Sequence, residues 1–457
     1  MNVFNLYLEE DSMREMKESG FEWIEKIPED WKIKNLKNVF NFKKGLSITK
    51  DNLIEQGQPV ISYGQIHANF NKGTYIDERL IRYVSKDYLR FNSACLTKHG
   101  DFIFADTSED LAGCGNAVYN DTSEKIFAGY HTIILSNSDF DNKYFAYLFQ
   151  TDVWRSQIRE RVFGVKLFSI TQKILKECKV IIPSEEERLK ISNFLDTKCS
   201  EIDLLMKDIK QQISQLEEYK KSVITKTVTK GLVPGIGLKD SGIEWIGKIP
   251  KTWSVNGLKY VFNFKKGLSI TKDNLIDNGQ PVISYGQIHA KYNTGTSIDE
   301  RLVRYVSDDY LKFNYNCLTR HGDFIFADTS EDLIGCGNAV YNDTLDEIFA
   351  GYHTIILSNN DFDNKYFAYL FQTDLWRSQI RKKVFGVKLF SITQKILKEC
   401  SIIIPPKEER LLISNYLDDK CNTIDSIIES KQQQLSKLEE YKKSMIYEYV
   451  TGKKEVL

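Results

Sequence analysis

The sequence lacks the short motifs that identify most enzymes. It contains no Walker A segment and no GxGxxG, HExxH or (D/N)PP(Y/F) motif. Their absence excludes the commonest nucleotide-binding, zinc-protease and methyltransferase sites. The eight cysteines include no CxxC pair, which argues against a cysteine zinc site and favours free thiols in a reducing compartment. No apolar run approaches the ~18–20 residues that a membrane-spanning helix needs.

Composition and charge are those of an ordinary globular protein. Hydrophobic residues make up 42% and charged residues 27% of the 457 positions, and the net charge is −1. The chain therefore has enough apolar side chains for a substantial core. Its first residues include Glu9, Glu10 and Asp11, where a secretory leader would be basic and then apolar. We therefore expect a cytoplasmic protein.

The most informative feature is an internal repeat with a constant shift of 222 residues. Trp31 matches Trp253, for example, and Tyr219 matches Tyr441. Residues 40–178 differ from residues 262–400 at 20 of 139 positions. Because solenoid repeats are several times shorter than this, the period indicates a duplicated domain.

Each repeat ends in a stretch with the pattern of a long helix, residues 184–230 and 406–453. Ser184 and Glu187 have the spacing of a capping box, and at ~1.5 Å per residue each helix would be roughly 60 Å long. A single apolar stripe cannot remain exposed to water, so we expect the two helices to pack against each other. The predicted seam is Leu195, Ile202, Leu205, Ile209, Leu216, Tyr219 and Val223, with Leu417, Ile424, Ile427, Leu438, Tyr441 and Met445 in the second copy.

The part of each repeat before the long helix mixes strands and helices. Short β-rich runs at 59–62, 101–104 and 132–135 alternate with glycine turns, and residues 142–161 have the apolar spacing of one helix. Helices do not alternate regularly with strands, which indicates an α+β fold. The predicted organisation is an N-terminal arm (1–18), a first domain (19–182), a central helix (183–230), a linker with the second domain (231–404) and a distal helix (405–457).

Two local groups of residues could carry chemistry. Cys114 and His131 could form a nucleophile couple, but no local signature supports it, and packed thiols with hydrogen-bonded histidines are the simpler interpretation. Asp106, Glu109 and Asp110 could bind a metal ion, although their polar surroundings are typical of an exposed loop.

The order of motifs in both repeats resembles the specificity (S) subunit of type I restriction–modification systems. The resemblance covers the chain from Ser19 onward. One departure lies at Arg188 and Arg410, where the family more often has Gln. The matching motifs are P-x-x-E-E-R (183–188 and 405–410), FLD or YLD-x-K (194–198 and 416–420), EYK-x-S (218–222 and 440–444), TKGL followed by EWIGxIP (229–250) and VTGK (450–453).

This resemblance implies both a fold and a function. In the family, two target recognition domains alternate with two long antiparallel helices in a pseudo-twofold arrangement, and the subunit itself is not catalytic. The resemblance implies binding of double-stranded DNA and assembly with two modification (M) subunits, which carry S-adenosylmethionine and methylate adenine N6. Restriction (R) subunits, which use ATP and Mg, join such complexes. No cofactor or metal is expected in this chain.

Contacts to DNA are expected from polar loops, because base edges need donors and acceptors, and phosphates attract Lys, Arg, Ser and Thr. Segments 41–50, 62–67, 106–110 and 163–168 meet this requirement, and none contains any of the 20 substitutions. The candidates are Lys43, Lys44, Ser47, Thr49, Tyr63, Gln65, His67, Thr107, Ser108, Glu109 and Lys166, with Lys265, Lys266, Ser269, Thr271, Tyr285, Gln287, His289, Thr329, Ser330, Glu331 and Lys388 in the second copy.

Two matched readers related by a twofold axis predict an interrupted palindrome, with half-sites ~34–36 Å apart. Residues 40–178 hold 17 basic and 16 acidic side chains, and the second copy holds 16 and 17, so we expect weak DNA binding by the isolated chain. Two other interpretations remain open at this point. One is a coiled-coil scaffold with paired ligand-binding domains, and the other is a duplicated hydrolase that uses Cys114 and His131.

Overall fold

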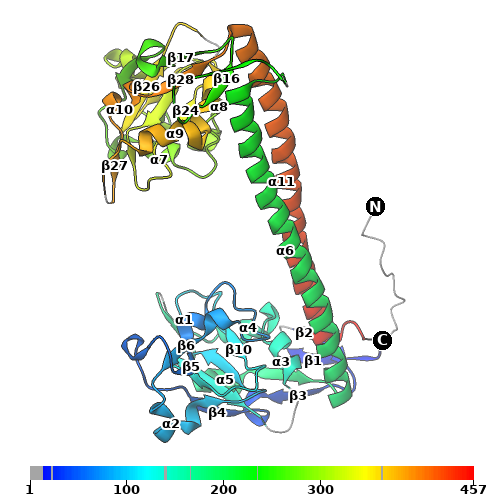
Figure 1. Ribbon diagram of the computed structural model, residues 1–457. Helices are drawn as coiled ribbons and strands as arrows, with labels where there is room; N and C mark the ends of the chain where they lie inside the picture. The colour runs from blue at the N-terminus through cyan, green and yellow to red at the C-terminus, as the bar shows by residue number, and fades with distance from the viewer. Residues whose placement is uncertain are drawn as a thin grey trace. The chain divides into compact units, whose positions relative to one another are not determined.

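The computed structural model describes residues 14–21, 24–137, 142–164, 166–233, 235–361, 364–386 and 388–456. The chain forms two compact units (Figure 1). Unit 1 contains residues 1–209 and 433–457, and unit 2 contains residues 210–432. Two long helices, α6 (Glu185–Lys230) and α11 (Lys407–Val450), each contribute one part to each unit.

Unit 1 contains two four-stranded sheets. Neighbouring strands of the first sheet are all antiparallel, whereas the second sheet contains one parallel pair, β5 with β11. In spatial order, the first sheet consists of β10 (Ala117–Tyr119), β8 (Phe102–Ala105), β12 (Thr132–Ser136) and β4 (Asn41–Lys44), and the second of β6 (Arg82–Val84), β5 (Gln58–Ile61), β11 (Ile126–Ala128) and β7 (Leu96–Thr97).

Strand β8 lies at the centre of this domain because both of its faces are buried. Phe102 and Phe104 belong to the core beneath the helices, whereas Ile103 and Ala105 belong to the core between the two sheets. A continuous apolar strand is the pattern expected when both faces are covered. The domain therefore has three layers, namely helices, the first sheet and the second sheet. Helices that cover one face of a sheet fit the predicted α+β class.

Unit 2 repeats these elements. Its first sheet has the order β18-β26-β22-β24 and its second sheet the order β20-β19-β25-β21. The bounds are β17 (Ser254–Gly257), β18 (Asn263–Lys266), β19 (Gln280–Ile283), α7 (Tyr285–Ile288), β20 (Arg304–Val306), β21 (Leu318–Thr319), β22 (Phe324–Ala327), β23 (Thr329–Ser330), β24 (Ala339–Tyr341), β25 (Ile348–Ala350), β26 (Thr354–Ser358), β27 (Phe390–Ser391), α10 (Gln394–Lys398) and β28 (Ser401–Ile404).

The single helix predicted over residues 142–161 is wrong. The structure has two helices there, α3 (Lys143–Leu148) and α4 (Asp152–Arg159), separated by residues 149–151. Thr151 is extended, with φ −70° and ψ 138°, and its hydroxyl accepts a hydrogen bond from the backbone N–H of Trp154. A threonine that caps a new helix interrupts the old one, and unit 2 has the same break between α8 (Lys365–Gln372) and α9 (Asp374–Arg381).

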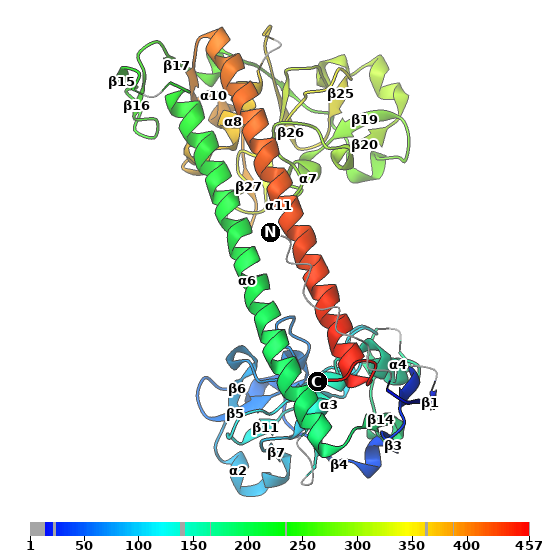
Figure 2. The ribbon, with the colours of Figure 1, turned by 90° about the vertical axis from the view of Figure 1, so that its right-hand side faces the viewer.

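The long helices run antiparallel within each unit, as predicted (Figure 2). In unit 1, the rings of Phe194 and Tyr449 pack with centroids 4.4 Å apart and planes tilted by 43°, and Lys442 Nζ lies 2.7 Å from Asp203. In unit 2, Lys220 Nζ lies 2.6 Å from Asp425. Asp425 is the repeat equivalent of Asp203, and Lys442 that of Lys220, so the two units use the same ion pair with the helices exchanged.

The predicted seam is partly wrong. Leu205 and Tyr219 are 46% and 56% exposed, and the second-copy residues Ile427 and Tyr441 are 41% and 60% exposed. The remaining predicted seam residues are buried or half-buried. The apolar line instead passes through residues outside the predicted seam, including Cys199, Met206 and Cys421.

The sheet-containing domain of each unit is held to both long helices through one short helix. In unit 1, the hydroxyl of Tyr144 donates to the carbonyl of Val450 at 2.7 Å, and that of Tyr147 donates to Asp196 at 2.6 Å. Lys143 forms an ion pair with the same aspartate at 3.0 Å. Helix α3 therefore contacts both α6 and α11.

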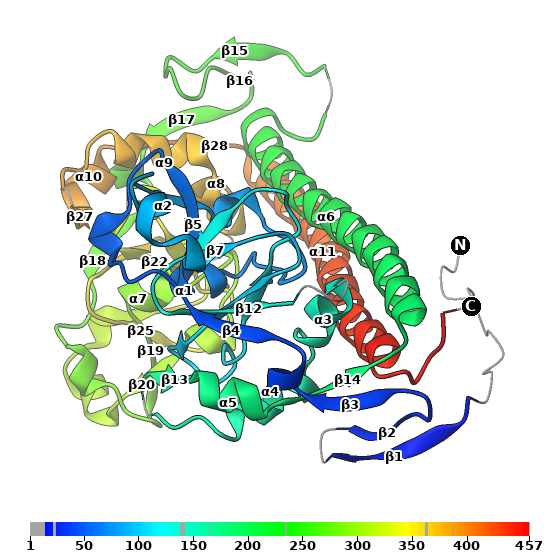
Figure 3. The ribbon, with the colours of Figure 1, turned by 90° about the horizontal axis from the view of Figure 1, so that it is seen from below.

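The N-terminal arm was predicted for residues 1–18, and residues 1–13 lie outside the described part of the chain. From Arg14 onward the chain is held in place, because Arg14 forms ion pairs with Glu187 and, at 3.1 Å, with Asp30. Strand β1 (Met16–Phe21) then pairs with β2 (Ile24–Pro28) (Figure 3). Strands β15 (Leu238–Asp240) and β16 (Lys248–Pro250) pair in the same register in unit 2.

The revised seam can be tested with two adjacent substitutions in α6. Met206 is 7% exposed and packs in the core of unit 1, so Met206→Ala should lower the free energy of unfolding by about 2–3 kcal/mol. Leu205→Ala should cost less than about 1 kcal/mol, because nearly half of its surface already faces water. Urea unfolding followed by helical circular dichroism measures both, and a larger effect at Leu205 would contradict this register.

Candidate nucleic-acid interface

Three loops of unit 1 meet at one end of β8 and β12, the two central strands of the first sheet. Residues 106–108 follow β8, His131 immediately precedes β12, and Ile170 follows β13 (Phe168–Ser169). The backbone N–H of Asp106 donates to the carbonyl of His131 at 3.0 Å, and that of Ile170 donates to the carbonyl of Asp106 at 2.7 Å. Strand β9 (Thr107–Ser108) also pairs with β13. The backbone therefore fixes these loops relative to one another.

The short helix α1 (Tyr63–Ile66) adds an aromatic side chain to this group of loops. The N–H of Tyr63 donates to the carbonyl of Tyr130 at 3.3 Å. The Tyr63 ring lies edge-on to two neighbours, 5.6 Å from Tyr130 and 5.4 Å from His131 between centroids. We refer to Tyr63, Asp106, Thr107, Tyr130 and His131 as the loop cluster. All five residues recur in the second copy as Tyr285, Asp328, Thr329, Tyr352 and His353.

His131 has the most unusual backbone in the loop cluster. In the described part of the chain, the only residues other than glycine with a positive φ are His131 and its equivalent His353, and the angle is 54° in both. The His131 side chain is 59% exposed, and its Nδ1 lies 3.2 Å from Asp106 Oδ1. The sequence-based list of DNA contacts did not include it. The Gly-Tyr-His turn before a strand was the available signal, and only the backbone angles make its importance visible.

His67 and Gln65 are held in structural roles. His67 Nε2 lies 2.8 Å from the Thr107 carbonyl, and its Nδ1 lies 3.1 Å from Asn116 Nδ2. Both ring nitrogens are therefore used inside the domain. Gln65 Oε1 accepts from the N–H of Ser62 at 3.1 Å as part of a capping box. His289 and Gln287 make the same bonds in unit 2. These bonds do not favour the predicted base contacts.

The predicted contact by Ser108 is not compatible with the structure. Ser108 is 1% exposed, and its hydroxyl donates to the carbonyl of Asp110 at 2.7 Å. Its equivalent Ser330 is equally buried. Thr107 and Thr329 are 8% exposed and donate to the preceding aspartate at 2.7 Å. In contrast, Glu109 and Glu331 are exposed. Strand pairing with β13 or β27 turns the serine inward, which sequence spacing alone did not reveal.

The segment after β4 runs beside the loop cluster. A Cβ on Gly45 would lie 2.1 Å from the hydroxyl oxygen of Thr132 and 2.3 Å from the carbonyl of Gly129, so only glycine permits this close approach. The predicted DNA contacts in β4 and in the segment after it are exposed, although Thr49 also caps a short turn through Asn52. These residues are Lys43, Lys44, Ser47 and Thr49, with Lys265, Lys266, Ser269 and Thr271 in unit 2.

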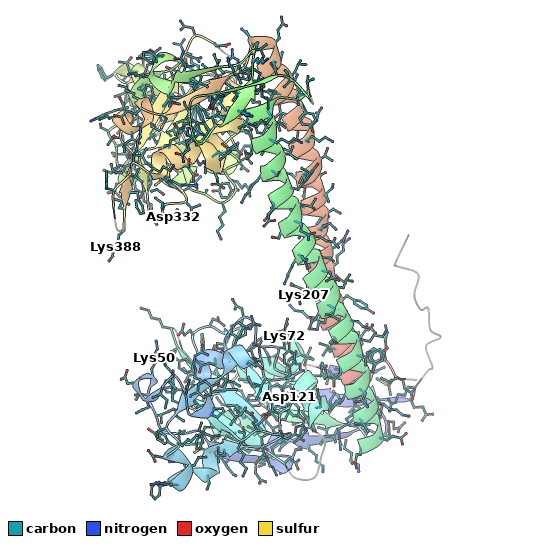
Figure 4. All side chains as sticks on the ribbon, viewed as in Figure 1. Lys50, Lys72, Asp121, Lys207, Asp332 and Lys388 are labelled. Atoms are coloured by element: carbon teal, nitrogen blue, oxygen red, sulfur yellow. The ribbon has the colours of Figure 1, made fainter. Side chains whose placement is uncertain are left out.

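Lys166 lies in a protruding loop that also exposes apolar side chains. Phe163 is 88% exposed and Leu167 is 56% exposed, and Lys166 itself is exposed. In Figure 4, Lys388 is labelled in the equivalent loop before β27. Phe163 was not predicted, although an exposed aromatic side chain beside Gly164 and a lysine is the available sequence signal. This loop is unchanged between the copies over residues 162–168.

A groove of about 640 Å³ forms a second candidate surface in unit 1. Its wall includes Arg155, whose guanidinium donates to Asn116 Oδ1 at 2.6 Å and to the carbonyl of Phe149 at 2.8 Å. Burial lowers the pKa of Arg155 to about 10. The groove walls differ between copies: Lys72, Ala112 and Val153 are replaced by Thr294, Ile334 and Leu375. A function shared by both copies is therefore better placed at the invariant loop cluster.

The geometry does not assemble a hydrolase. Cys114 is fully buried, its Sγ donates to the Asp110 carbonyl at 3.6 Å, and burial raises the pKa of its thiol. His131 instead contacts Asp106. Within the described ranges, no group of three or more His, Cys, Asp or Glu residues could hold a metal ion. No helix in that part of the chain is long and apolar enough to cross a membrane.

Comparison with known proteins agrees with this architecture. The family described as "Type I restriction modification DNA specificity domain" matches residues 28–215 and 250–440. The chain is 23% identical to the type I restriction enzyme MjaVIII specificity subunit of Methanocaldococcus jannaschii and 26% identical to the putative MjaX specificity subunit of the same organism. Each alignment covers 96% of this chain and 97% of the relative.

Solved structures show the same fold. A chain from a study of complex assembly and conformational transition of the type I R-M system aligns with a TM-score of 0.67 and 16% identity, over 93% of this chain and 99% of that one. The HsdS subunit of Thermoanaerobacter tengcongensis aligns with a TM-score of 0.51 and 15% identity, over 93% and 98%. With its two matching domains and two long helices, the chain therefore belongs to the specificity subunits of type I restriction–modification systems.

Proposed function

We propose that each recognition domain reads one half of a bipartite DNA site through its loop cluster and through exposed residues of two further loops, Ser47 and Thr49 in one and Phe163, Lys166 and Leu167 in the other. The observation that carries this proposal is the distribution of the 20 differences between the copies. They avoid all three of these surfaces, but they change the groove walls at Lys72, Ala112 and Val153. Two domains that present the same polar and aromatic groups should bind the same bases.

The chain acts in this proposal as a non-catalytic reader within a larger cytoplasmic complex. Two modification subunits would supply S-adenosylmethionine and methylate adenine N6, and restriction subunits, where present, would use ATP and Mg. Exposed apolar residues on the long helices support a docking role, since Leu205, Tyr219, Ile427 and Tyr441 remain 41–60% exposed in this chain. Apolar side chains on a helix face are commonly covered by a partner.

The two half-sites should be inverted copies of one sequence. Antiparallel pairing of two equivalent helices is the topology expected of parts related by a twofold axis. The ion pairs Asp203–Lys442 and Asp425–Lys220, which exchange the helices between units, support that relation. Matched readers related by a twofold axis require an interrupted palindrome, with half-sites about one helical turn apart.

Methylation mapping tests this arrangement. Cells that express the chain with its modification partner should contain N6-methyladenine within one motif whose halves are reverse complements, separated by unread base pairs. Single-molecule sequencing of the genomic DNA measures the motif directly. Two unrelated half-sites would contradict the shared specificity, and the absence of any new methylated motif would contradict the proposed function itself.

Charge predicts that the isolated chain binds DNA weakly. The 17 basic and 16 acidic residues of positions 40–178, and the 16 and 17 of the second copy, leave little net attraction for phosphates. Addition of the modification partner should strengthen binding by at least about tenfold, because the partner would supply further phosphate contacts. Fluorescence anisotropy at 150 mM salt, a physiological ionic strength, measures both affinities, and nanomolar binding by the chain alone would contradict the prediction.

A further inference from the structure

We propose that His131 and His353 each read one base of their half-site through the ring nitrogen Nε2, and that the base read carries an exocyclic amino group in the major groove. This inference rests on the proposed function, and it assigns a specificity-determining role to a residue that the sequence pattern did not single out.

The first argument is the strained backbone. A φ of 54° places His131 in the left-handed region, which is uncommon for residues other than glycine, although Asn, Asp and His adopt it more often than the rest. The conformation is fixed locally, since Asp106 N–H donates to the His131 carbonyl and Thr132 Oγ1 donates to the Gly129 carbonyl at 2.6 Å. Glycine would adopt this angle more easily, yet both copies keep histidine. Strain that persists in this way points to a function for the side chain.

The second argument is the fixed orientation of the ring. Tyr63 and Tyr130 lie edge-on to it, with centroids 5.4 and 6.2 Å away. Asp106 Oδ1 lies 3.2 Å from Nδ1 and also accepts from Thr107 Oγ1. An ionised carboxylate only accepts hydrogen bonds, so Nδ1 carries the proton. In the neutral ring, Nε2 is therefore an acceptor, and no hydrogen bond to Nε2 is found within the described residues.

An acceptor at this position selects between bases. In the major groove, adenine N6 and cytosine N4 offer N–H donors, whereas the O6 and N7 of guanine and the O4 of thymine are acceptors. The Nε2 lone pair would bond to an amino group and oppose a carbonyl oxygen. His67 provides an internal contrast, because both of its nitrogens are used within the domain. His67 thus holds the loops together through both of its ring nitrogens, whereas Nε2 of His131 is available to bind a ligand.

The variants that test this are His131→Gly, His353→Gly and the double substitution, in the full chain with its modification partner. Glycine suits φ 54°, so the ring is removed without adding backbone strain, and thermal unfolding should be little changed. The matched control is Lys72→Thr, which gives the first copy the residue that the second already carries. It should leave the methylated motif unchanged.

The expected result is a relaxed motif. His131→Gly should make one base pair of one half-site degenerate. His353→Gly should do the same in the other half-site, and the double variant should do so in both. Methylation of the original site should fall on the order of tenfold to a hundredfold, the range expected for loss of one good base contact.

An unchanged motif in the double variant would overturn the assignment. If a variant methylates too little DNA to define a motif, binding is measured against duplexes that each carry one altered base pair, and against a duplex in which hydrogen replaces the exocyclic amino group of the base pair in question. Loss of discrimination at one base pair, with the parent chain weakened by removal of that amino group and the glycine variant unaffected, supports the proposal. A uniform loss of discrimination, or a parent chain that does not respond to removal of the amino group, overturns it. An inactive parent complex would instead count against the proposed function.

Discussion

The structure depends on the burial of one apolar stripe along two long helices. Helices α6 and α11 contain 46 and 44 residues, and helices of this kind are stabilised in proteins mainly by the packing of an apolar face. In unit 1 that stripe is continuous with the core of the recognition domain, since Met206 and Met445 belong to the same cluster as Phe104 and Trp154. The paired helices and the domain therefore share one core, and no residue of the loop cluster belongs to it.

The sequence was sufficient to predict the architecture because its signals are regular. The 222-residue repeat is visible when the two halves of the sequence are compared directly, and the apolar strand β8 and the apolar stripe of each long helix are local patterns. The seam failed at Leu205 and Tyr219 because hydrophobicity alone ranks them above Cys199. The observed seam also includes Lys442, because the carboxylate of Asp203 on the other helix neutralises its charge. The sequence of one helix alone does not predict an ion pair with a residue of another helix.

The loops that form the candidate site could be predicted from the sequence, but the role of each side chain in them could not. Segments 62–67 and 106–108 were chosen for their polar composition, and the structure brings them together through the His67–Thr107 contact. The roles of His67 and Gln65 depend on which hydrogen bonds they make. The His67 bond to Thr107 spans 40 residues, so no local pattern contains it. His131 was missed for the related reason that backbone strain appears only when the turn is closed by Asp106.

The division of the long helices has a consequence for synthesis on the ribosome. Unit 2 is a continuous segment, residues 210–432, whereas unit 1 joins residues before 210 to residues after 432. The Val450 carbonyl that accepts from Tyr144 is made some 300 residues after its donor, and domains generally fold as units during translation. The first domain to be synthesised is thus the last to be completed. The apolar face of its part of α6 has no partner helix until the last residues of the chain have been made.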